Sequence, residues 1–241
     1  MELSKRLQAV AGLVTAGYKM ADIGTDHAYI PIYLIENKIV PSAIAMDINE
    51  GPLERAKEHV TECGLGGKID LRLSDGLAAL RPGEAQTAVI AGMGGGLVMK
   101  ILKAHPDVTA GLEECILQPQ SEIAKVRAFL LEEGFLFINE DMVLEDGKYY
   151  PMMKVQPPSQ REPDRMEEPT EFWTETEIRY GKLLLKNRHP VLRQFLEREI
   201  SLKTSIVRNL ENQDSPHAKE RRRELEKDLV YAQKGMEYYA V

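Results

Sequence analysis

The chain has few cysteines and no long apolar run, and each absence excludes a class of protein. Its 241 residues include only two cysteines, Cys63 and Cys115, which are too few for a disulfide framework or a thiolate zinc site. No stretch approaches the roughly 18 consecutive apolar residues of a membrane span, and the first residues lack the apolar core of a signal peptide. We therefore expect a cytoplasmic protein that does not enter the membrane and holds no metal.

The chain also lacks an overall excess of positive charge. Its formal net charge is −7, from 31 Lys and Arg against 38 Asp and Glu. The charge is unevenly spread, because residues 171–241 carry 14 basic and 12 acidic side chains, whereas residues 1–170 carry 17 and 26. A weakly basic C-terminal part on an acidic body permits local contact with a polyanion but does not require it.

Apolar runs in residues 1–157 alternate between the periods of strands and helices. The expected strands are Tyr18–Ile23, Ser42–Asp47, Ile69–Leu73, Ala85–Ala91, Glu114–Gln118, Phe135–Leu144 and Lys148–Val155. Helices such as Gly51–Cys63 and Gly95–Ala104 lie between the first five, which predicts a mostly parallel, doubly wound α/β sheet. Only Glu145-Asp146-Gly147 separates the last two strands. Because Asp-Gly between strands indicates a hairpin, we expect the sheet to end in an antiparallel pair.

A polar, proline-rich stretch then separates this domain from a helical one. We expect a linker at 158–170 and a C-terminal domain at 171–241. One helix face is predicted from Leu192, Phe195, Leu196, Leu202, Ile206 and Leu210. The spacing of a coiled-coil seam recurs in Leu225, Leu229, Ala232, Met236 and Tyr239. With a break and helix cap at Asp214-Ser215-Pro216, these patterns predict an antiparallel helical hairpin, although such a seam also suits pairing between two chains.

The first expected strand ends in a turn that suits a positively charged cofactor. Gly24 has no Cβ, so the backbone can approach a ligand closely there. The second and third glycines of the dinucleotide fingerprint are absent, and Asp26 adds a negative charge that would repel a pyrophosphate. S-adenosylmethionine (SAM), with its sulfonium and ammonium groups, fits Asp22, Thr25 and the Asp26-His27 pair better than NAD does. The alternative is an ordinary strand–turn–helix connection.

Two further acidic residues follow the next two strands. Asp47, before Ile48, stands where a carboxylate accepts hydrogen bonds from both ribose hydroxyls of an adenosyl group. Its alternative role is to cap the helix that starts near Gly51. Asp75, before Gly76, is a candidate acceptor for the adenine amino group, although Asp-Gly is also a common turn.

The fourth strand ends in a loop that is rich in glycine. Ala91, Gly92 and Met93 open it, and residues 92–96 include four glycines. So many glycines cost backbone entropy, which packing alone explains poorly. Because open α/β sheets bind ligands at the carboxyl ends of their strands, we predict that this loop faces the reacting methyl group. The alternative is a flexible connector.

Together these segments resemble the bacterial TrmK-type tRNA methyltransferases, which methylate N1 of adenine 22. The resemblance is carried by Leu3–Leu7, Ala21–Tyr29, Ile90–Gly95, Ile116–Pro119, and Glu145–Lys148 with Tyr150. It covers the N-terminal domain closely and continues more loosely through Arg179-Tyr180-Gly181 into the hairpin. It implies a class I SAM methyltransferase with a Rossmann-like sheet that ends in an antiparallel pair, a C-terminal coiled-coil hairpin, SAM as cofactor and tRNA as partner. The implied cofactor contacts fall on Gly24, Asp26, Asp47, Asp75 and the Gly92-Met93 loop.

The loop after the fourth strand lacks the Asn/Asp-Pro-Pro-aromatic motif that amino-group methyltransferases often carry, which fits a ring-nitrogen target better. Adenine N1 already holds an in-plane lone pair, so catalysis rests mainly on alignment, and the base must leave its stack. Tyr29 is the candidate to stack on the base, and Asp26 and His27 are candidates to orient the sulfonium or the adenine amine. Arg6 is a candidate donor to the methionine carboxylate. The alternatives are a core tyrosine, a histidine that bonds a backbone carbonyl, and a surface arginine.

Basic side chains of the hairpin are candidates to contact tRNA phosphates. They are Arg188, Arg193, Arg198, Lys203 and Arg208 on the first helix, and Lys219, Arg221, Arg222 and Arg223 on the second. The alternative is a solvated face paired with Glu197, Glu199, Glu220 and Glu224. Two other functions stay open: a module that binds SAM and RNA with little catalysis, and a small-molecule methyltransferase whose hairpin dimerises.

Overall fold

The computed structural model describes residues 2–160, 172–211, 213 and 215–240. Its contacts divide the chain into two compact units, Met1–Thr170 and Glu171–Val241. Of the predicted linker at 158–170, the structure describes one short 3-10 turn, η1 (Pro158–Gln160). Residues 161–170 lie outside the described residues.

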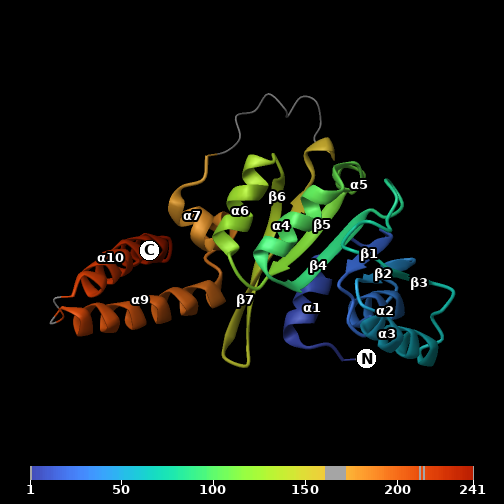
Figure 1. Cartoon of the computed structure of the whole chain (residues 1–241), viewed down its shortest axis with the longest axis horizontal. Helices are drawn as coiled ribbons and strands as arrows, with labels where there is room; N and C mark the ends of the chain where they lie inside the picture. The colour runs from blue at the N-terminus through green and yellow to red at the C-terminus, as the bar shows by residue number, and fades with distance from the viewer. Residues whose placement is uncertain (1, 161–171, 212, 214, 241) are drawn as a thin grey trace. The chain divides into compact units, whose positions relative to one another are not determined.

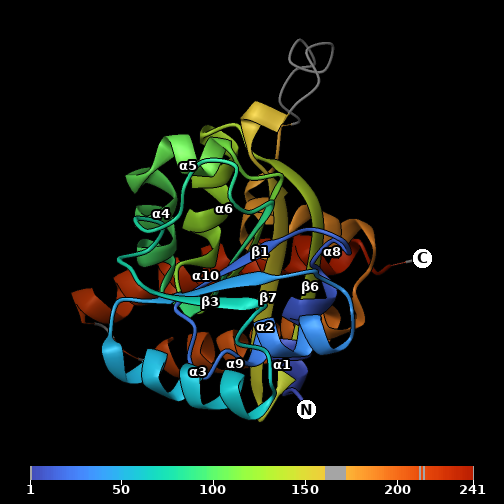
Figure 2. The same cartoon turned by 90° about the vertical axis from the view of Figure 1, so that its right-hand side faces the viewer.

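The first unit is built on a seven-stranded sheet with helices on both faces (Figures 1 and 2). Its strands are β1 (Met20–Ile23), β2 (Ala43–Asp47), β3 (Ile69–Leu73), β4 (Thr87–Met93), β5 (Glu114–Pro119), β6 (Leu136–Glu145) and β7 (Lys148–Gln156). Their order in the sheet is β3-β2-β1-β4-β5-β7-β6. The first five pair in parallel, whereas β7 runs antiparallel to both β5 and β6. The prediction of a parallel sheet that ends in an antiparallel pair is therefore confirmed.

Two apolar cores lie on the two faces of this sheet. The helices are α1 (Lys5–Gly12), α2 (Tyr29–Glu36), α3 (Glu50–Glu62), α4 (Gly95–Ala104), α5 (Pro106–Ala110) and α6 (Ile123–Glu132). One core includes Val10 of α1 and Val60 of α3, and the other includes Val98 of α4 and Leu130 of α6. Figure 2 shows α1–α3 on one side of the strands and α4–α6 on the other. Because both faces are covered, β1 and β5 are buried along their whole length.

The strand order reverses next to β1, and this reversal positions the predicted motifs. Ile23 at the end of β1 pairs with Met46 of β2 and with Ile90 of β4. The carboxyl ends of these strands therefore meet at one edge of the sheet. A crevice outside such a switch point is the usual ligand site of an open α/β sheet.

The second unit is helical. It contains α7 (Glu175–Tyr180), α8 (Lys182–Lys186), α9 (Pro190–Leu210) and α10 (Pro216–Glu237). Ser215 caps α10 by accepting a hydrogen bond from Ala218 N, and Pro216 occupies its first turn, so this part of the predicted break is confirmed; Asp214 lies outside the described residues. Leu196 of α9 packs on Gly235 of α10. No helix in the described part of the chain is long and apolar enough to cross a membrane.

The predicted apolar face of α9 is wrong over the second half of the helix. Leu196 is buried as predicted, but Leu202 and Ile206 are 49% and 43% exposed. Lys203 turns inward instead, and its ammonium lies 3.2 Å from Asp228 Oδ2 on α10. Residue i+6 is rotated about 240° from residue i, whereas i+7 returns almost to the same face. The inward stripe therefore continues from Leu196 to Lys203 and Val207.

Candidate active site

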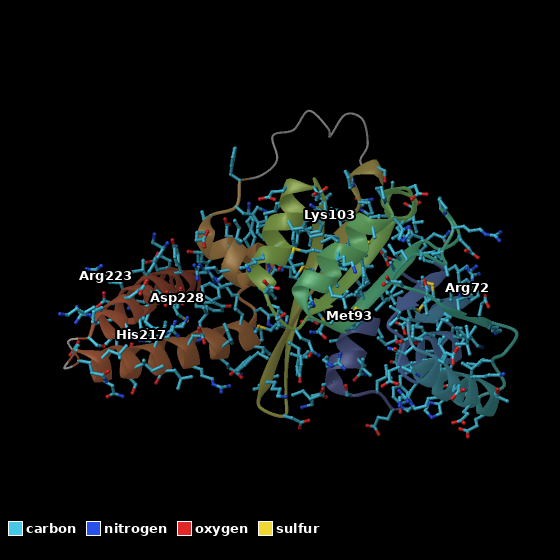
Figure 3. The ribbon with its side chains drawn as sticks, in the orientation of Figure 1. Arg72, Met93, Lys103, His217, Arg223 and Asp228 are labelled. Carbon is cyan, nitrogen blue, oxygen red and sulfur yellow. The ribbon has the colours of Figure 1, made fainter. Side chains whose placement is uncertain are left out.

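The turn after β1 brings the first and fourth motifs into contact. Gly24 has a φ of +76°, a conformation that side chains disfavour. A Cβ atom at this position would collide with the terminal methyl group of Met93, which lies at the end of β4 (Figure 3). The amides of Gly24 and Thr25 both donate to the Met46 carbonyl of β2, at 2.8 and 2.9 Å. The predicted need for glycine at residue 24 is therefore confirmed by its backbone conformation.

Two left-handed residues follow this turn, and the sequence did not reveal them. His27 and Ala28 have φ values of 63° and 54°, which costs roughly 1–2 kcal/mol per residue for a residue with a Cβ. The His27 carbonyl is held by His59 of α3, whose Nδ1 lies 3.1 Å away. Since a carbonyl only accepts, Nδ1 of His59 is the donor in this bond. His59 therefore supports the strained backbone that starts α2.

The rings of His27, Tyr29 and His59 form an aromatic cluster at this turn. His27 stacks on Tyr29 and on His59 with ring centroids 5.0 Å apart in both pairs. Tyr29 is half-buried rather than a core residue. The Nδ1 atom of His27 is buried and accepts or donates no hydrogen bond among the described residues, so the interpretation of His27 as a partner of a backbone carbonyl is wrong for its side chain.

Asp26 is exposed and paired with a residue that the sequence did not point to. Its Oδ1 accepts hydrogen bonds from Arg55 of α3, at 2.8 Å from Nη2 and 3.2 Å from Nε. His27 Nε2 lies 3.5 Å from the same oxygen. Such an exposed ion pair is weak, so a ligand can replace Arg55 at little cost. Arg55 falls within a predicted helix, but no local pattern indicates that it faces Asp26.

Asp22 is a buried carboxyl beside an unpaired hydroxyl. Burial raises the pKa of Asp22 to about 6; the nearby Thr25 hydroxyl opposes this rise and the negative charge of Asp47 adds to it. The Thr25 hydroxyl is close enough to affect this charge, yet it is buried and has no partner in hydrogen-bonding geometry among the described residues. A cationic ligand group at this turn would favour the ionised form of Asp22. The site therefore fits a cofactor that carries an ammonium or sulfonium group.

Asp47 holds a turn and does not cap a helix. Its Oδ1 accepts a hydrogen bond of 2.8 Å from the amide of Asn49, and Asn49 itself is the N-cap residue of α3, without a side-chain cap bond. The helix-cap alternative for Asp47 is therefore wrong. Two large apolar side chains stand exposed at the same edge, Ile48 at 59% and Leu73 at 56%. They offer apolar surface to a planar ring.

Asp75 and Gly76 follow β3 at this edge. Asp75 is exposed, and Gly76 has a φ of +59°. The hydroxyl of Ser74 donates to the Gly76 carbonyl at 2.9 Å and accepts from the Ala79 amide at 3.0 Å. These bonds fix the turn and leave the Asp75 carboxylate at the surface.

The loop after β4 needs its glycines for different reasons. Gly92 has a φ of +80° at a break in the β4–β5 register. A Cβ on Gly95 would lie 2.5 Å from the Ser121 carbonyl oxygen and 2.8 Å from a Val126 methyl carbon. Packing therefore explains Gly95, contrary to our expectation that packing accounts poorly for this loop. Gly95 also begins α4, so the loop is short and ordered by its neighbours rather than a flexible connector.

Arg6 reaches this loop from α1. Its Nη1 donates to Gln118 Oε1 at 3.1 Å, and the Gly92 amide donates to the same oxygen at 3.2 Å. The guanidinium carbon lies 5.7 Å from the centroid of the Tyr150 ring. Arg6 is half-buried, so its interpretation as a plain surface residue is wrong. The sequence pointed to Arg6 but assigned no role to Gln118 or Tyr150.

The candidate RNA-binding residues belong to the second unit and are partly paired. Arg193 pairs with Glu197 and Arg221 with Glu224, as the solvated-face alternative expects, and Arg222 pairs with Glu226. Arg223, labelled in Figure 3, is exposed, as is Arg188. Neither has an ion pair in the part of the chain that the structure describes. No group of three or more His, Cys, Asp or Glu among these described residues is arranged to hold a metal ion.

The chain is similar to known methyltransferases. A methyltransferase-domain family model matches residues 3–153. A curated tRNA (adenine(22)-N(1))-methyltransferase of Bacillus subtilis is 44% identical over 153 residues, and the aligned part of the chain spans 64% of that relative's length and 64% of this chain. The crystal structure of the B. subtilis m1A22 tRNA methyltransferase TrmK is similar with a TM-score of 0.82 and 33% identity, over 98% of this chain and 99% of that one. The M. capricolum TrmK structure in complex with S-adenosyl-homocysteine has a TM-score of 0.81 and 29% identity, over 99% of both chains.

Proposed function

Since this chain belongs to the TrmK family of tRNA methyltransferases, we propose that it transfers a methyl group from SAM to N1 of adenine 22 in tRNA. One observation supports this most directly. The contact between Gly24 and Met93 joins the first and fourth motifs, at the edge where Asp22 lies near the end of β1, Asp47 ends β2 and Asp75 follows β3. Three carboxylates and no phosphate-binding glycine fingerprint at this edge suit a positively charged adenosyl cofactor.

Different residues at this edge bind different parts of the cofactor. Asp47 accepts hydrogen bonds from the ribose hydroxyls, the exposed Ile48 and Leu73 side chains lie against adenine, and Asp75 accepts from its amino group. Asp22 and the unpaired Thr25 hydroxyl lie nearest the cationic end. When bound, SAM supplies an electrophilic methyl group on a positively charged sulfur.

The acceptor base is held by the turn that follows β1. Tyr29 offers a half-buried ring for stacking, and its orientation is fixed by its contact with His27. Adenine N1 keeps its lone pair at neutral pH, so the site needs no general base, and alignment supplies most of the rate. Methylation places a positive charge on the adenine ring, which the exposed Asp26 carboxylate stabilises once a ligand displaces Arg55.

The second unit supplies the contact with tRNA. We assign this role to Arg188, Arg193 and the run Arg221-Arg222-Arg223, which are basic side chains of α9, α10 and the turn before α9. The ion pairs of Arg193 and Arg221 are exposed and therefore exchange readily for phosphate contacts. The reaction belongs in the cytoplasm, where both tRNA and SAM are found.

Methylation of unmodified tRNA by the purified chain tests this proposal. The enzyme is incubated with labelled SAM and tRNA transcripts, and the RNA is digested to nucleosides. We expect the label in N1-methyladenosine. Label in another nucleoside would assign a different target atom. SAM binding without transfer to RNA would leave a binding module or a small-molecule methyltransferase.

A further inference from the structure

The side chain of Gln118 connects two segments of the site that are far apart in sequence. Gln118 lies in β5 and is fully buried. Its Oε1 accepts hydrogen bonds from Arg6 Nη1 of α1 (3.1 Å) and from the Gly92 amide (3.2 Å). Its Nε2 donates to the Pro119 carbonyl at 3.2 Å. These three partners fix which end of the amide carries the oxygen, because two donors face one atom and a carbonyl faces the other.

A carboxamide is costly at this position unless its bonds are needed. Gln118 follows Cys115, Ile116 and Leu117, which are all fully buried apolar residues of the same strand. An unpaired amide in such surroundings would lose its hydration without compensation. The Gly92 amide lies at the register break in β4, and Gln118 provides its hydrogen-bond acceptor. The bond to Arg6 does not serve the sheet, since Arg6 lies on a helix outside it.

The contact leaves most of the Arg6 guanidinium available to a ligand. Only Nη1 donates to a described residue, and the Tyr150 ring lies 5.7 Å from the guanidinium carbon. A guanidinium carries five N–H donors in a planar fork that matches a carboxylate. Because the carboxamide is neutral, it holds the fork in place without cancelling its charge. A glutamate would hold the fork equally well but would neutralise it.

We infer that Gln118 is a positioning residue that aims Arg6 at the carboxylate of the cofactor's amino-acid part, an inference that rests on the proposed function. Gln118 does not touch the cofactor. It acts on the ligand through Arg6, whereas its bond to the Gly92 amide serves the register break of the sheet. Its effect is therefore confined to ligands that carry the carboxylate.

Two ligands that differ in this carboxylate provide the test. S-adenosylhomocysteine has the amino-acid part, whereas 5′-methylthioadenosine keeps the adenosine and sulfur and lacks it. Titration calorimetry gives both dissociation constants for the full chain and for Gln118→Met and Gln118→Glu. We expect Gln118→Met to weaken S-adenosylhomocysteine binding by about tenfold, the loss of one hydrogen bond to a charged group. Gln118→Glu should weaken it to a similar extent, because the new carboxylate neutralises the charge of Arg6. Binding of 5′-methylthioadenosine should stay within about twofold, the usual error of such a comparison.

Matched variants separate positioning from a loss of structure. Gln8→Glu adds the same charge as Gln118→Glu at an exposed site of α1 and should leave both affinities unchanged. In an Arg6→Met background, Gln118→Met should have little further effect, because the residue through which it acts is gone. Equal weakening of both ligands by Gln118→Met would overturn the inference, as would an unchanged ratio of the two affinities. If the wild-type chain bound neither ligand, the proposed function itself would be wrong.

Discussion

The terminal methyl group of Met93 lies against Gly24, in the space that a Cβ atom on residue 24 would fill. This contact links the turn after β1 to the loop after β4, the two segments assigned to the cofactor and to the methyl group. The backbone on both sides of this contact adopts a conformation that favours glycine. Gly24 has a positive φ value, and so does Gly92, the residue before Met93. The geometry of the site therefore depends on glycine at residue 24 and on the position of the Met93 side chain.

Gly24→Ala should impair cofactor binding more than it impairs stability. The positive φ costs about 1 kcal/mol of unfolding free energy, and the new methyl group displaces Met93 from the site. Gly64→Ala is the matched control, because Gly64 has a φ of +67° but no atom within 4 Å of the place that its Cβ would take. Urea unfolding should give similar losses for both variants, whereas S-adenosylhomocysteine binding should weaken at least about tenfold only in Gly24→Ala, equivalent to about 1.4 kcal/mol. Equal affinities in the two variants would contradict this account.

Asp22→Asn should stabilise the fold at neutral pH. Burial raises the pKa of Asp22 from 3.8 to about 6, so between these values the unfolded chain releases its proton before the folded chain does. The stability that Asp22 contributes is therefore present below pH 4 and is lost as the pH rises towards 6, by about 3 kcal/mol in total. Asparagine cannot ionise. The free energy of unfolding of the variant, relative to that of the wild type, should therefore rise by up to this amount between pH 4 and pH 7.

Urea unfolding at several pH values measures this difference, and affinity provides a second readout. Because the ionised form of Asp22 attracts a cationic ligand, SAM should bind the wild type more tightly as the pH rises through about 6. This pH dependence should disappear in Asp22→Asn. If the variant instead lost stability relative to the wild type as the pH rises, the pKa of Asp22 would not be raised in the folded protein.

Asp47→Ala should weaken S-adenosylhomocysteine binding by about 2–3 kcal/mol, because two hydrogen bonds from the ribose hydroxyls to a carboxylate are lost. Asn49→Ala is the control. It keeps the backbone amide that donates to Asp47 Oδ1 at 2.8 Å and removes only the weaker side-chain donor Nδ2, 3.4 Å from the same oxygen, so its affinity should stay close to that of the wild type. Calorimetry measures both variants, and an unchanged affinity in Asp47→Ala would mean that the ribose is bound elsewhere.

Replacing Arg221, Arg222 and Arg223 by glutamate should weaken tRNA binding and leave SAM binding alone. Arg221 and Arg222 pair with Glu224 and Glu226 of the same helix, and none of the three arginines is buried, so the charge reversal does not disturb a core. A gel shift over a range of salt concentrations should give a lower affinity and a smaller salt slope, because fewer counterions are released from the tRNA. Wild-type affinity with a wild-type slope would exclude these three residues from the tRNA contact.

The sequence predicted those parts of the fold that depend on local patterns. Uninterrupted apolar runs marked the buried strands, Asp146-Gly147 marked the β6–β7 hairpin, and Ser215-Pro216 marked the start of α10. The seam of α9 could not be read in the same way, because the apolar Leu202 lies off the inward face and the polar Lys203 lies on it. The ion pairs of Lys203 with Glu199 and Asp228, on its own helix and on α10, accompany its inward position.

The sequence predicted which residues lie at the sheet edge better than it predicted the contacts that support them. Asp22, Gly24 and Asp47 each follow or end an apolar run, so their place at the sheet edge follows from the strand. The left-handed backbone of His27 and Ala28 has no such signal, since neither residue type favours that conformation strongly. Contacts such as Asp26 with Arg55 and Arg6 with Gln118 join residues 29 and 112 positions apart, and no spacing in the sequence indicates them.

The most direct test of the central claim compares two unmodified tRNA transcripts that differ only at position 22, one with adenine and one with guanine. Each is incubated with the purified chain and labelled SAM, and the RNA is digested to nucleosides. We predict N1-methyladenosine from the adenine transcript and no label from the guanine transcript. Equal labelling of both transcripts would contradict the assigned position, and no labelling of either, with SAM bound, would contradict the assigned activity.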